Sequence, residues 1–111
     1  MGYCNVEDVQ AIINTDMKVA EIQTLIDMVD AFIALKIDVS SVGTLILFGI
    51  SQAWSAYRVM LKDPTSERIG DISSDRKANL MALKAEYMEM IDDAIASGGL
   101  AFSVGKAEYI Q

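Results

Sequence analysis

The longest stretch without a charged residue runs from Val39 to Tyr57, and its length alone would allow a membrane span. Polar residues nevertheless interrupt it, and the surrounding segment 42–62 divides into two stripes at helical spacing. The apolar stripe holds Leu47, Ile50, Trp54, Tyr57 and Leu61, and the polar stripe holds Thr44, Ser51, Ser55, Arg58 and Lys62. This two-sided pattern favours the central helix of a soluble bundle over a membrane helix.

Two glycines in this segment, Gly43 and Gly49, would each cost an isolated helix roughly 1 kcal/mol. We therefore expect them to mark the close approach of another helix. Pro64 follows the segment, and the helix must end near Asp63 because proline disfavours helical geometry in the residue before it.

The amino-terminal part predicts two more helices. The stretch CNVEDVQAII, residues 4–13, indicates a short helix capped by Asn5, with Cys4 packing on Val9 rather than acting as a reactive thiol. Residues 19–37 indicate a long amphipathic helix. Its expected buried stripe is Ile22, Leu25, Ile26, Val29 and Ile33, and its expected solvent face is Gln23, Asp27 and Asp30.

A last long helix is expected over residues 75–96, capped by Ser74 and ended by Ser97-Gly98-Gly99. Its buried stripe is Leu80, Leu83, Tyr87, Met90, Ile91 and Ala94, and its solvent face is Glu86, Glu89 and Asp93. The predicted fold is therefore all-α: a small bundle of about four helices, with a long loop before the last helix and an extended carboxy-terminal tail. Residues 1–99 form the helical domain with a protruding loop at 63–74, and residues 100–111 form the tail.

Composition excludes several functions. The net charge is −7 and there is no histidine, which argues against a protein that grips a phosphate backbone. The single Cys4 excludes an internal disulfide and a multi-cysteine metal site, and the start of the chain does not read as a signal peptide. The middle of the chain is mildly basic and both ends are acidic, which suits either simple solvation or the packing of identical subunits.

An enzymatic hypothesis would rest on carboxylates that share a helix face. Glu86, Glu89 and Asp93 form one such set, and Asp27 and Asp30 another, and helix-borne acids of this kind hold magnesium in all-α nucleotide pyrophosphatases. The same acids, however, form the solvent faces of amphipathic helices. No histidine, glycine-rich phosphate loop or lysine cluster accompanies them. We therefore expect no catalytic, cofactor-binding or metal-binding residues, with the pyrophosphatase as the least favoured alternative.

The loop KDPTSERIGDISSD, residues 62–75, is longer than most helix connections in bundles. Ile69 and Ile72 flank a Gly70-Asp71 bend, a composition that a plain solvated spacer would not need. The tail, with Leu100, Phe102, Val104, Tyr109 and Ile110, is too apolar for a disordered end. The pattern leaves two possibilities open: the tail packs on its own bundle, or it docks on a partner.

Two stretches resemble a known family. TSERIGDIS, residues 65–73, and the opening YCNVEDVQAII, residues 3–13, are similar to motifs of the head–tail connector, or adaptor, proteins of tailed phages and archaeal tailed viruses. The order of helices, loop and tail resembles that family over nearly the whole chain. Ile72 and Asn5 depart from it, since an aromatic residue and a threonine are common there.

The resemblance implies a structural virion protein without catalysis. It implies a homo-oligomeric ring, usually a dodecamer, between the portal protein and the stopper or tail-completion protein, with DNA passing through the centre and no membrane contact. The protein would lie in the neck of the virion and in the host cytoplasm during assembly. The implied subunit or ring interface is the loop Ser66, Glu67, Arg68, Ile69, Gly70, Asp71, Ile72 and Ser73, and the candidate portal-docking tail is Leu100, Phe102, Val104, Tyr109 and Ile110.

The alternative to this hypothesis is a small non-viral helical protein with an interaction or regulatory role. Such a protein would form a fixed small oligomer and have no affinity for a portal.

Overall fold

The fold is an all-α helical bundle, as the sequence predicts. The computed structural model describes residues 3–63, 66–68 and 76–96. Over these residues the helices are α1 (Val6–Gln10), α2 (Val19–Lys36), the 3-10 turn η1 (Val39–Ser41), α3 (Thr44–Lys62) and α4 (Arg76–Ala94). Most of the predicted loop and the whole of the predicted tail 100–111 lie outside the described residues.

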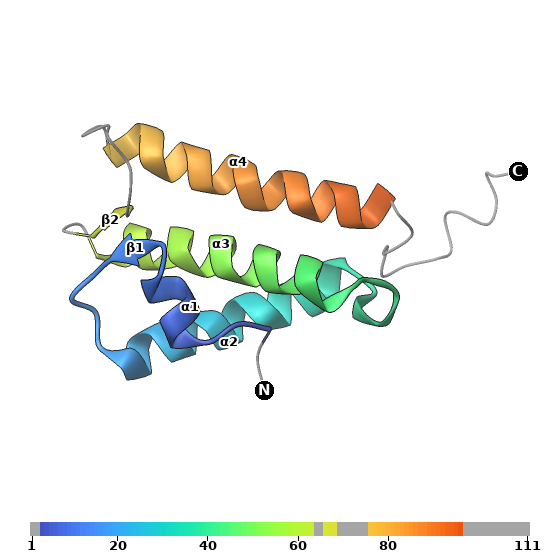
Figure 1. Cartoon of the computed structure of the whole chain (residues 1–111), viewed down its shortest axis with the longest axis horizontal. Helices are drawn as coiled ribbons and strands as arrows, with labels where there is room; N and C mark the ends of the chain where they lie inside the picture. Colours follow the sequence, from blue (N-terminus) through green and yellow to red (C-terminus); the bar gives the residue numbers. More distant parts are fainter. Residues whose placement is uncertain (1–2, 64–65, 69–75, 97–111) are drawn as a thin grey trace, which may run out of the picture.

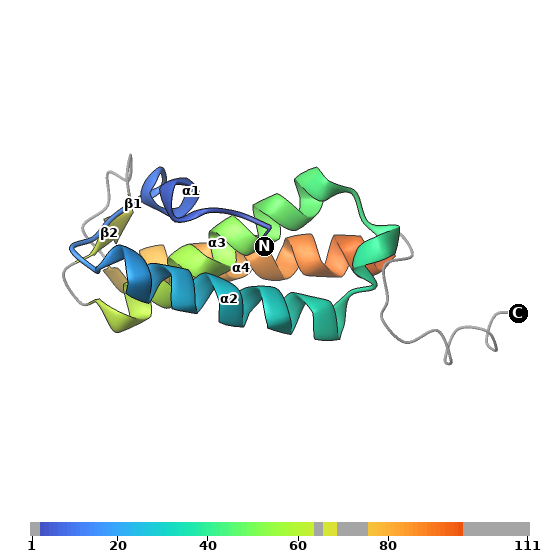
Figure 2. The ribbon, with the colours of Figure 1, turned by 90° about the horizontal axis from the view of Figure 1, so that it is seen from below.

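Helix α3 is the centre of the bundle. It packs against α1, α2 and α4, and Figure 1 shows it between α4 on one side and α1 and α2 on the other. Figure 2, seen from below, shows α1 and α2 on opposite sides of α3, so that three helices surround it. No helix within the described ranges is long and apolar enough to cross a membrane.

The buried stripe predicted for α2 is confirmed, because all five of its residues lie below 7% exposure. The stripe of α4 is confirmed at Leu83, Tyr87, Ile91 and Ala94, while Leu80 and Met90 are half-buried. The core divides into two clusters. One contains Cys4, Val9, Ile22 and Leu83, and the other contains Val29, Ile33, Trp54 and Ile91.

The polar stripe predicted for α3 is wrong in its middle. Ser51 and Ser55 are fully buried, whereas Leu61, assigned to the apolar stripe, is 49% exposed. The reason is that α3 has neighbours on three sides, so small polar residues can be enclosed where larger ones could not.

The two glycines of the third helix have different roles. A Cβ at Gly49 would lie 3.2 Å from Met90 Sδ of α4, so the expected close approach of another helix is confirmed there. At Gly43 the prediction is wrong, because a Cβ would meet nothing within 4 Å. Gly43 is instead the N-cap of α3.

The first helix is shorter than predicted. It ends at Gln10, and Ile13–Asn14 form the short strand β1, which pairs antiparallel with β2 (Glu67–Arg68). Ile13 is opposite Arg68, and Asn14 is opposite Glu67. This pairing joins segments more than fifty positions apart, so a local helical pattern could not reveal it.

Candidate functional site

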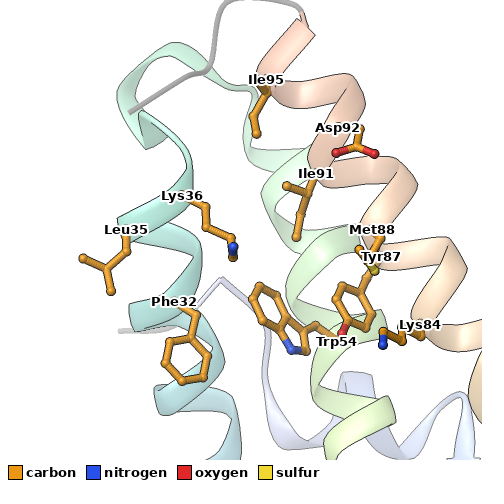
Figure 3. Close-up of a pocket in the computed structure, with 10 residues that line it drawn as sticks. All are labelled: Phe32, Leu35, Lys36, Trp54, Lys84, Tyr87, Met88, Ile91, Asp92 and Ile95. Carbon is orange, nitrogen blue, oxygen red and sulfur yellow. The ribbon is translucent and has the colours of Figure 1, made fainter. Parts of the chain in front are cut away.

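A groove of about 740 Å³ lies between α2 and α4. Helices α2 and α4 both pack on α3, and Trp54 of α3 lies between them at the base of the groove (Figure 3). The groove is lined by Phe32, Leu35, Lys36, Trp54, Lys84, Tyr87, Met88, Ile91, Asp92 and Ile95.

Stacked aromatic rings form the base of this groove. The Trp54 and Tyr87 rings are nearly parallel, with centroids 4.8 Å apart, and Phe32 stacks on the other side of Trp54 at 5.8 Å. The Arg58 guanidinium lies 5.7 Å from the Phe32 ring centroid, within cation–π range. Burial raises the pKa of the Tyr87 hydroxyl. These contacts hold three rings from three helices in one arrangement.

The chemistry of the groove is that of a binding surface. Its lining is mainly apolar, and its charged side chains are Lys36, Lys84 and Asp92. Lys36 points from α2 into the groove in Figure 3. An apolar, aromatic-based groove with few charges suits the apolar side chains of a protein segment.

The groove is not among the sites predicted from the sequence. On α2, a second apolar row at helical spacing, Met28, Phe32 and Leu35, lies beside the core stripe, and its last two residues line the groove. Leu35 is 69% exposed and Met28 is 36% exposed. A row of this kind on an otherwise well-defined amphipathic helix indicates a second apolar contact surface.

The predicted interface loop is described only where it leaves α3. Ser66 is 2% exposed, and its hydroxyl donates to the Asp63 backbone carbonyl over 2.7 Å. Glu67–Arg68 pair with β1, and the Thr15 hydroxyl donates to the Asp63 carboxylate. The first part of the loop is therefore fixed to the bundle.

The remaining predicted site residues lie outside the described residues. These are Ile69, Gly70, Asp71, Ile72 and Ser73 of the loop, and Leu100, Phe102, Val104, Tyr109 and Ile110 of the tail. Their proposed contacts stay predictions.

The acidic residues that were considered for a magnesium site lie on the solvent side of their helices, as the amphipathic pattern predicts, with one exception. Asp27, Glu89 and Asp93 are exposed and Glu86 is half-buried. Within the described parts of the chain, no group of three or more Cys, Asp or Glu side chains is arranged to hold a metal ion. Asp30 is the exception, because it faces α3 rather than solvent.

Asp30 is the centre of a polar cluster that the sequence did not reveal. The Ser51 hydroxyl donates to Asp30 Oδ1 over 2.7 Å, and the Tyr3 backbone N–H donates to Asp30 Oδ2 over 3.0 Å. Cys4 Sγ lies 3.2 Å from Ser51 Oγ, and since the single Ser51 proton is already donated, the thiol is the donor there. Burial raises the pKa of Cys4 to about 11, which agrees with its predicted packing role.

We expect the stability contributed by Asp30 to fall as pH rises. Burial is the main cause that raises the pKa of this carboxyl above its ordinary value of 3.8, against the opposing hydrogen bonds from Ser51 and Tyr3. The contribution is complete below the unfolded-state pKa and is lost as pH rises through the higher folded-state pKa.

The variant Asp30→Asn does not titrate at this position. Its free energy of unfolding should therefore improve relative to that of the parent chain as the pH rises from below the ordinary Asp pKa to above the raised folded-state pKa. Urea denaturation at each pH measures this difference. Asp16→Asn, an exposed position, is the control for loss of one surface charge. A difference that moves the opposite way with pH would contradict the assignment.

Comparison with protein-family models, with curated proteins and with solved structures finds no match for this chain.

Proposed function

We propose that this chain is a structural protein of the head–tail adaptor class, without catalytic activity. In this proposal its copies form a ring between a portal protein and a stopper or tail-completion protein in the neck of a tailed virus. DNA passes through the ring as cargo. The proposal is supported by the resemblance of residues 3–13 and 65–73, and by the arrangement of two surfaces in the bundle.

The observation that carries the proposal is that the loop and the groove occupy separate places along α3. The loop that bears the resemblance begins beside β2, where α3 ends (Figure 1). The groove lies over the middle of α3, at Trp54, and along the carboxy-terminal parts of α2 and α4. Trp54 at the base of the groove lies about 12 Å along α3 from Lys62, its last residue before the loop. A protein that joins two different rings needs two contact regions that face in different directions.

Exposed apolar residues offer a surface for neighbouring subunits. Leu45 is 84% exposed and Ile46 is 45% exposed, both in the first turn of α3. In a ring, each subunit contacts its neighbours through two different surfaces, and this exposed apolar turn supports one of them.

Co-expression with the portal protein of the virus to which the proposal assigns this chain tests the proposal. Electron microscopy should find a ring of this protein on the portal for the full chain, and loss of the ring for a chain that ends at Gly99. The full-length double variant Tyr109→Asp/Ile110→Asp should also lose it if the tail docks on the portal. A ring that survives both changes would move the docking surface away from the tail, and no association with the full chain would refute the adaptor proposal.

The groove also favours a second candidate, a small helical interaction or regulatory protein of non-viral origin. Such a protein would use the aromatic base to bind one partner segment. It would form the same small oligomer with or without a portal protein. Sedimentation of the purified chain, compared with the portal co-expression result, separates the two candidates.

A further inference from the structure

We propose that the groove between α2 and α4 holds residues 100–104 of the same chain. The groove is apolar and has an aromatic base. This contact goes beyond the adaptor proposal and does not depend on it, since it involves one chain only.

The position of the groove favours the chain's own tail as its occupant. Helix α4 ends at Ala94, and the next residue, Ile95, lines the groove. Only four residues then separate Ile95 from Leu100. They include Gly98 and Gly99, whose wide conformational range allows the chain to reverse direction within a short turn.

The sequence after the turn has the pattern that such a groove requires. Leu100, Phe102 and Val104 alternate with the small residues Ala101 and Ser103. In an extended segment, alternate side chains point to the same side, so the three apolar side chains would enter the groove together while the small ones face solvent.

The length of the segment 100–104 also suits the groove. The segment from Leu100 to Val104 spans about 13 Å when extended. The groove lining on α4 and the turn after it runs from Lys84 to Ile95, about 16 Å, and its part from Tyr87 at the aromatic base to Ile95 spans about 12 Å. A segment that reverses after α4 and runs antiparallel to it would therefore cover the aromatic base and end near Tyr87.

Covalent attachment makes even a weak contact sufficient. A short flexible linker gives the tail an effective concentration of about 1 mM at the groove. A segment with an intrinsic Kd of about 0.1 mM would then be docked in about 90% of molecules. A partner that binds the tail must displace it from the groove first, so the docked tail would shield its own apolar residues before assembly.

Two full-length variants that differ by one position test the contact. Phe102→Asp places a charge on the side that should face the groove, and Ser103→Asp places the same charge on the opposite side. Trp54 is the only tryptophan, so acrylamide quenching reports access to the base of the groove. We expect Phe102→Asp to increase quenching and to shift the Met88 methyl resonance, and Ser103→Asp to leave both close to those of the parent chain.

A second pair of variants tests the groove side. Met88→Glu alters a groove residue that is 47% exposed, and Met81→Glu alters a residue of the same helix that is 60% exposed and does not line the groove. We expect Met88→Glu alone to increase the amide mobility of residues 100–104 in 15N relaxation. Circular dichroism checks that the helices remain folded.

Equal effects of Phe102→Asp and Ser103→Asp would overturn the proposal, as would tail mobility that Met88→Glu leaves unchanged. Dependence of the parent chain's signals on protein concentration would also overturn it, because the groove would then hold the tail of a second copy. No portal protein enters these measurements, so their failure is separate from a failure of the adaptor proposal.

Discussion

Trp54→Ala should lower the free energy of unfolding by about 3–5 kcal/mol, the usual cost of removing a large aromatic side chain from a core. Trp54 is 6% exposed and stacks between Phe32 of α2 and Tyr87 of α4. Its removal leaves a cavity at the point where three helices meet. Since small domains are stable by only about 5–15 kcal/mol, this loss would be a large fraction of the total.

Urea denaturation followed by circular dichroism measures the effect, because the variant lacks the fluorescent reporter. Leu45→Ala is the matched control on the same helix. Leu45 is 84% exposed, so its truncation should change stability by no more than about 0.5 kcal/mol. A loss at Trp54 no greater than that at Leu45 would contradict the arrangement of the aromatic stack.

Helical periodicity predicted the long helices because they bury one apolar stripe each. In α2 the five residues assigned to the stripe are the five that are buried. The prediction of residues 19–37 therefore ended within one residue of the observed helix. A pattern of this kind depends only on the local sequence.

The same reasoning failed where burial depends on distant residues. Ser51 and Ser55 appeared to face solvent because they are polar, but Ser51 has a carboxylate partner, Asp30, on another helix. No local pattern shows that these two residues meet. For the same reason, Ile13 seemed to extend α1, although it pairs with Arg68 in the β1–β2 ladder.

The groove could be predicted in part, because some of its residues have a local sequence pattern while their meeting depends on distant segments. Phe32, Leu35 and Met88 are visible as apolar residues outside the core stripes, so the sequence contains a signal for a second surface. Whether such residues form one groove depends on the spacing of α2 and α4 across α3. That spacing is set by the residues of α3 between them, including the stacked Trp54.

Leu83→Ala should lower the free energy of unfolding by about 2–5 kcal/mol, because Leu83 is fully buried in the core cluster that also contains Cys4, Val9 and Met60. Met81 lies two residues earlier and is 60% exposed, so Met81→Ala should lower the free energy of unfolding by about 0.5 kcal/mol or less.

Tyr87 and Ile91 hold α4 in the other core cluster. Hydrogen exchange should therefore accelerate first in the part of α4 before Leu83, beside the loop, while the groove end stays protected. Equal acceleration along all of α4 would mean that the two clusters hold the helix as one unit, and the loop end could not move without opening the groove.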